Sequence, residues 1–100
     1  MLGHRRGPRI TMTKLKIEVL YAPGCGSCKR IEYATIAAVE ELGLDVPVER
    51  LIDYREAQNR GATQTPALFI NGKLMLQGRY PPPDEIKEII QQQLKLNADA

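Results

Sequence analysis

The sequence has no tryptophan, one phenylalanine, one histidine and two cysteines, and it carries no large excess of either charge. Fourteen basic residues against twelve acidic ones leave a net charge of +2, so the composition gives no reason to expect nucleic acid as a partner. No apolar run approaches the roughly 20 residues of a membrane span, and no stretch has the length of a secretory signal. We therefore expect a cytoplasmic protein with no nucleic-acid or membrane partner. A chain of 100 residues has room for one small domain.

The first segment differs in composition from the rest of the chain. Residues 1–13 contain glycine, proline and four basic or imidazole side chains, which are His4, Arg5, Arg6 and Arg9. They contain no aspartate or glutamate. We interpret this segment as a disordered or extended N-terminal tail, in which Met12 is a candidate start of the native chain. A mitochondrial transit peptide is the less favoured alternative, because the segment is short and its glycines and proline interrupt an amphipathic helix. Residues 14–96 are then the folded domain.

Short-range patterns predict seven secondary-structure elements in the order βαβαββα. The first of them alternates apolar and polar residues as a strand does, and the second carries apolar side chains at helical spacing and ends at Gly43. Asn71 and Gly72 are typical of a two-residue hairpin turn. We expect strands at residues 15–21, 46–51, 67–70 and 73–76, and helices at residues 27–42, 53–60 and 84–96. Because a crossover helix joins the first two strands in parallel, this order predicts an α/β fold: a four-stranded mixed sheet with helices on both faces.

The two cysteines lie together in the motif CGSC, where the first predicted strand gives way to the first predicted helix. A thiol at a helix N-terminus meets the positive end of the helix dipole, which favours the nucleophilic thiolate. The spacing also lets Cys25 and Cys28 close a small disulfide ring with little backbone movement. We expect the more exposed Cys25 to attack a substrate and Cys28 to resolve the mixed disulfide, with Gly24 and Gly26 keeping the approach open.

Other interpretations of the cysteine pair remain open. Two cysteines and His4 cannot complete a structural zinc site within one chain, although a dimer or a cuprous ion held by two thiolates would satisfy the motif, as in a metallochaperone or a metal-responsive switch. A buried structural pair and a binding module without catalysis are further alternatives. Lys29 and Arg30 either lower the pKa of the Cys25 thiol or form a solvated helix face, and Tyr21 either flanks a substrate groove or joins the core. We favour redox chemistry, which requires neither a metal nor a cofactor.

The segments YAPGCGSCK, TQTPALFINGK and LMLQG resemble the thioredoxin superfamily, and most closely its small glutaredoxin-like thioredoxins, also called redox-active disulfide proteins. The resemblance covers residues 14–95. It implies a monomeric thiol–disulfide oxidoreductase that acts on protein disulfides and receives electrons from a reductase or a low-molecular-weight thiol. It also implies that the Thr65–Pro66 bond is cis and lies beside the cysteines, which leaves the backbone of Thr65 available to an extended substrate. Only an X-Pro bond adopts the cis form at tolerable cost.

The sequence departs from the family pattern at three places. Gly24 replaces the tryptophan that usually precedes the first cysteine, and Val19 stands where thioredoxins carry a buried carboxylate. Glu18 is a weak substitute for that carboxylate, because it lies on the opposite pleat of the strand. The third departure is the segment Gln77, Gly78 and Arg79, which lacks the double glycine of a glutathione site. It either captures a glutathione carboxylate or simply ends the strand, and a single glycine favours the strand end.

Overall fold

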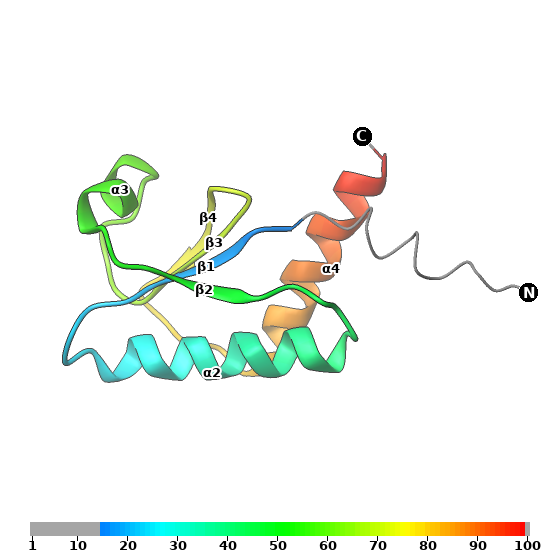
Figure 1. The fold of residues 1–100 in the computed structure, drawn as a ribbon, viewed down its shortest axis with the longest axis horizontal. Coiled ribbons are helices and arrows are strands. Elements are labelled where there is room, and N and C mark those ends of the chain that lie inside the picture. The colour runs from blue at the N-terminus through cyan, green and yellow to red at the C-terminus, as the bar shows by residue number, and fades with distance from the viewer. Residues whose placement is uncertain (1–14, 100) are drawn as a thin grey trace, which may run out of the picture.

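The computed structural model describes residues 15–99 (Figure 1). The predicted tail of residues 1–13 lies outside the described residues, so its assignment and the role of His4 stay predictions. The predicted element order is confirmed. In chain order the elements are β1 (Ile17–Leu20), α2 (Gly26–Glu41), β2 (Val48–Leu51), α3 (Tyr54–Asn59), β3 (Ala67–Ile70), β4 (Lys73–Gln77) and α4 (Pro83–Asp99).

The four strands form one mixed sheet in the order β2-β1-β3-β4. β1 and β2 are parallel, with Ile17 opposite Val48, whereas β1 pairs with β3 and β3 with β4 in antiparallel fashion. The hairpin between β3 and β4 turns at Asn71 (φ 54°) and Gly72 (φ 81°), and these two positive φ angles are those of the predicted two-residue turn. The strand directions bring the end of β1, the end of β2 and the start of β3 to one edge of the sheet.

Helices cover both faces of the sheet, as predicted. On one face α2 and α4 pack on the odd-numbered residues of β1, and the central side chains of this core are Ile17, Val19, Ile31, Leu68, Ile86 and Ile90. On the other face Ala57 of α3 packs in a smaller core with Leu20 and Phe69. In Figure 1 α2 and α3 lie on opposite sides of the strands. Since both faces are covered, all four residues of β1 are buried, the charged Glu18 among them.

The bounds of β3 agree with the prediction, and the other element boundaries differ from the predicted ones by at most three residues, for local reasons. β2 begins at Val48 and not at residue 46, because the preceding Pro47 has no N–H with which to join the ladder. α2 begins at Gly26, since Cys25 has extended backbone angles and its sulfur accepts a hydrogen bond from Cys28 N. The predicted cap of α3 is confirmed: the Asp53 carboxylate accepts from Arg55 N and Glu56 N.

Candidate active site

Cys25 and Cys28 form a disulfide at the start of α2, with their Cα atoms 5.3 Å apart. Cys25 is the N-cap residue of the helix, and its Sγ accepts a hydrogen bond from Cys28 N at 3.2 Å and lies 3.5 Å from Ser27 Oγ. Cys28 is fully buried, while Cys25 is partly exposed. The pair therefore has one sulfur that an external group can reach and one that it cannot. The first is also the sulfur that lies against the unsatisfied amides of the helix.

A shallow hollow of about 210 Å³ lies beside Cys25 and is lined by Tyr21, Gly24, Cys25, Gly26 and Lys29. Tyr21, which directly follows β1, is partly buried, lines the hollow and is not among the residues of either core cluster; its part in substrate binding stays a prediction. Gly24 has φ 79°, a conformation that side chains other than glycine rarely adopt, while a Cβ at Gly26 would meet no atom within 4 Å. Of the two glycines, only Gly24 is thus required by the backbone.

The Thr65–Pro66 peptide bond is cis, as predicted. Pro66 is buried and Thr65 is exposed at the start of β3, on the sheet edge that carries the end of β1. The end of β4 anchors this segment, because the Pro66 carbonyl accepts from Gly78 N at 2.8 Å and Gln77 Oε1 accepts from Thr63 N and Gln64 N. The residues that line the hollow include neither Thr65 nor Pro66, so their part in substrate binding stays a prediction.

The hydrogen bonds at Gln77, Gly78 and Arg79 favour the strand-end interpretation of this segment. The Gln77 side chain and the Gly78 amide hold the Thr63–Pro66 loop, and Arg79 forms an ion pair with Glu85 in the first turn of α4. Gly78 N, Gln77 Oε1 and Arg79 Nη2 thus already have partners within the chain.

Two arginines stack on tyrosines near the start of α2, and we did not anticipate either contact from the sequence. The Arg50 guanidinium lies 4.3 Å from the centre of the Tyr21 ring, and the Arg30 guanidinium lies 5.3 Å from that of Tyr80. Arg50 also forms a bidentate ion pair with Glu32, at 2.8 and 3.2 Å. The sequence did contain a signal for the position of Glu32: it follows Cys28 by four residues and so lies on the same, buried face of the helix.

The position of the missing family carboxylate is apolar, as the sequence indicated. Val19 is fully buried in the core beneath α2. Glu18 points to the opposite face, where its carboxylate accepts from Arg60 Nη1 at 2.8 Å. Hydrogen bonds from Arg60 to Glu56 and to Glu18 raise the pKa of the Arg60 guanidinium. Glu18 is therefore engaged away from Cys28.

Neither a metal-binding cluster nor a membrane-spanning helix occurs in the part of the chain that the structure describes. Residues 15–99 contain no group of three or more His, Cys, Asp or Glu side chains placed to hold a metal ion. No helix among them is both long enough and apolar enough to cross a membrane.

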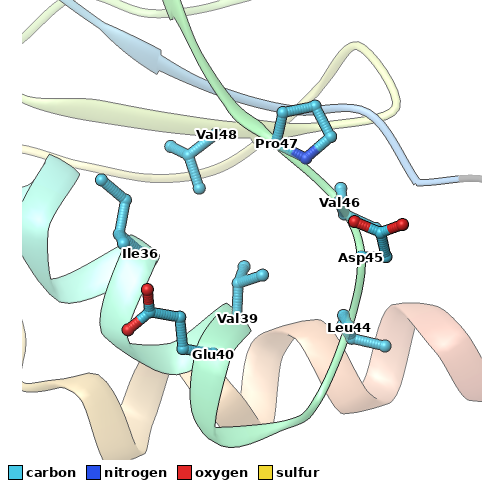
Figure 2. Close-up of a pocket in the computed structure, with 8 residues that line it drawn as sticks. All are labelled: Ile36, Val39, Glu40, Leu44, Asp45, Val46, Pro47 and Val48. Atoms are coloured by element: carbon cyan, nitrogen blue, oxygen red, sulfur yellow. The ribbon is translucent and has the colours of Figure 1, made fainter.

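A larger hollow, of about 480 Å³, lies near the opposite end of the sheet (Figure 2). Side chains of α2 such as Ile36 and Glu40 face those of the segment that leads into β2, including Leu44 and Val46. No cysteine, histidine or lysine lines it.

A family model, two curated relatives and a solved structure all relate this chain to thioredoxins. Residues 15–91 match the family model described as a thioredoxin domain. The protein named thioredoxin in Methanothermobacter thermautotrophicus is 34% identical over 76 residues, which are 76% of this chain and 97% of that protein. The thioredoxin of Methanocaldococcus jannaschii is 28% identical over 76% of this chain and 87% of its own length. Among solved structures, a mutant thioredoxin from Halobacterium salinarum superposes with a TM-score of 0.60 at 20% identity, over 90% of this chain and 84% of that one.

Proposed function

Since this chain belongs to the thioredoxin family and is a thiol–disulfide oxidoreductase, we propose that it uses the CGSC pair to reduce or exchange disulfides in protein or small-thiol substrates. One observation carries the proposal. The two sulfurs are already bonded to each other at a helix N-terminus, with Cys28 fully buried and Cys25 partly exposed. This asymmetry gives the two sulfurs different tasks.

The reaction begins with the dithiol form. The Cys25 thiolate attacks one sulfur of the substrate disulfide, the substrate S–S bond breaks, and the departing thiolate takes up a proton from solvent. Cys28 then loses its proton and attacks the Cys25 sulfur, which breaks the mixed disulfide and releases the second substrate thiol. The substrate gains two electrons and two protons, and the protein is left with the Cys25–Cys28 disulfide. Two electrons from a reductase or a low-molecular-weight thiol restore the dithiol.

The surroundings of Cys25 support this order of attack. A thiolate at the N-cap faces backbone N–H groups and the positive end of the helix dipole, and the Lys29 ammonium lines the same hollow. Cys28 has no exposed surface, so it reaches a substrate only through Cys25. We assign substrate contact to Tyr21, Gly24 and Gly26 around the hollow, and to the backbone of the exposed residue Thr65 before Pro66.

The test uses two serine variants of the full chain and a synthetic peptide that contains one intramolecular disulfide. We expect Cys28→Ser, once reduced, to accumulate a mixed disulfide with the peptide, which intact-mass measurement detects as a single adduct on Cys25. Cys25→Ser should form no adduct and reduce no peptide. Ser27→Ala, which alters the motif but keeps both thiols, is the matched control and should turn over.

Two results would contradict the proposal. The first is peptide reduction by Cys25→Ser at the rate of the unmodified protein. The second is alkylation of reduced Cys25 with the profile of an ordinary thiol near pKa 8.5 together with failure of the pair to oxidise reversibly in defined redox buffers. A stoichiometric metal in the purified protein would instead support the metal-binding alternative. We further propose that the protein works as a monomer in the cytoplasm, with protein disulfides as substrates.

A further inference from the structure

Arg50 contacts both Glu32 of α2 and Tyr21, which lines the hollow beside Cys25. We propose that Arg50 is a positioning residue: it holds the Tyr21 ring as one wall of the hollow beside Cys25 and so sets how well a disulfide substrate binds there. This inference rests on the proposed function, because it assumes that substrates enter the hollow that Tyr21 and Lys29 line.

Glu32 fixes the orientation of the guanidinium. Arg50 Nε donates to Glu32 Oε2 at 2.8 Å and Arg50 Nη2 donates to Glu32 Oε1 at 3.2 Å, so one edge of the guanidinium binds both carboxylate oxygens. The Glu32 side chain is only 9% exposed, whereas that of Arg50 is 48% exposed. These hydrogen bonds raise the pKa of the Arg50 guanidinium, which keeps its charge. A planar group held at two points by a buried partner cannot rotate freely.

The fixed guanidinium in turn restrains Tyr21. Its Cζ atom lies 4.3 Å from the centre of the tyrosine ring, within the range of a cation–π contact. The backbone of Tyr21 is also attached to β2, since Tyr21 N donates to Leu51 O at 3.0 Å. The tyrosine is thus held at its backbone and at its ring by consecutive residues of β2. Four residues further along the chain lies Cys25, on the other side of the Pro23–Gly24 turn.

The predicted effect of losing Arg50 is on substrate binding and not on thiol exchange. Without the guanidinium the Tyr21 ring samples other rotamers, and ordering it again when a substrate binds costs free energy. The cysteines, their helix cap and Lys29 are unchanged. A cation–π contact at a partly exposed site corresponds to about a two- to fivefold effect. We therefore expect KM to rise by about that factor while kcat stays within about 1.5-fold.

The experiment measures KM and kcat of the full chain for the disulfide peptide, with dithiothreitol as the recycling reductant. Arg50→Met should raise KM about two- to fivefold, both in the native protein and in a Tyr21→Phe background, where the ring is kept. In a Tyr21→Leu background, which has no ring to hold, Arg50→Met should leave KM unchanged. Lys87→Met is the matched control: it also removes a cation paired with α2, at Glu41, but away from the hollow, and should leave KM unchanged.

Two outcomes would overturn the inference. One is an unchanged KM in Arg50→Met, and the other is an equal rise of KM with and without the Tyr21 ring, which would mean that Arg50 acts directly on the substrate. If Arg50→Met does not fold, Glu32→Gln weakens the anchor with Arg50 in place and should show the same dependence on the ring. A native protein that reduces no peptide would refute the proposed function, whereas a fully active native protein with an unaffected Arg50→Met variant refutes the positioning role alone.

Discussion

Replacing Arg60 with methionine would remove the cation that faces Glu18 between the sheet and α3. Arg60 Nη1 lies 2.8 Å from Glu18 Oε1, and Arg60 Nε lies 2.8 Å from Glu56 Oε2. The guanidinium also lies 5.3 Å from the centre of the Phe69 ring. Methionine retains most of the apolar stem, so the substitution isolates the loss of the charge and its hydrogen bonds.

The size of the effect follows from the burial of the partners. The Glu18 side chain is 7% exposed and that of Arg60 is 19% exposed, so the variant leaves a carboxylate that is almost wholly buried and unpaired. Breaking a buried ion pair from one side costs about 3–5 kcal/mol, and the residual exposure of Arg60 places this pair at the lower end, at about 3 kcal/mol. Glu56 is 43% exposed in an i,i+4 pair, and its share is only about 0.3–0.5 kcal/mol.

Equilibrium unfolding in urea tests this estimate. With a slope of about 1 kcal/mol/M for a small domain, Arg60→Met should lower the midpoint by about 3 M. The double variant Glu18→Gln, Arg60→Met should regain much of that stability, because no charge is then left buried. Glu56→Gln is the matched control and should lower the midpoint by less than about 0.5 M. A loss below about 1 kcal/mol in Arg60→Met, or a double variant no more stable than the single one, would show that the buried charge is not what the arginine compensates.

Two further predictions concern the segment after β4. Gly78→Ala and Gly43→Ala should each lower the free energy of unfolding by about 1 kcal/mol, because both glycines have positive φ and the group nearest the new Cβ at Gly78 is the end of the exposed Gln64 side chain, which moves aside; a clearly lower urea midpoint for Gly78→Ala would show that Gln64 does not yield. The hydrogen bond from Arg79 lowers the pKa of Glu85, so this pair stabilises the fold above the ordinary carboxyl pKa and loses that contribution as the pH falls through that value and then through the lowered one. The difference in urea midpoint between the native protein and Arg79→Gln should therefore be present at pH 7 and shrink progressively as the pH falls below the ordinary carboxyl pKa, and a difference that does not change with pH would contradict the assignment.

Most of the fold was predictable because its signals are local. The alternation in β1, the apolar face of α2, the Asp53 cap and the Asn71–Gly72 turn each depend on neighbouring residues, and all of them lie where the sequence pattern indicates. The errors are of one to three residues at element ends, where one hydrogen bond decides the boundary. The burial of the charged Glu18 in β1 was less predictable, since it depends on where α3 docks and not on β1 itself.

The candidate site also contains features that short motifs predict and contacts that they do not predict. The Cys25–Cys28 pair at a strand-to-helix junction and the Thr65–Pro66 pair before an apolar strand are both readable as short motifs. The Arg50–Glu32 pair joins residues 18 positions apart, and the Arg60–Glu18 pair joins residues 42 positions apart. Neither pairing follows from composition, because several arginines and glutamates were available to each.

The sequence by itself determined the order of the elements and the identity and spacing of the reactive cysteines, since backbone preferences and helix capping act over a few residues. Only the tertiary structure decided which charge meets which and which aromatic ring each arginine covers. These contacts depend on the register of β1 against β2 and on the placement of α2 across the sheet. Both are results of packing the whole core, which no short stretch of sequence specifies.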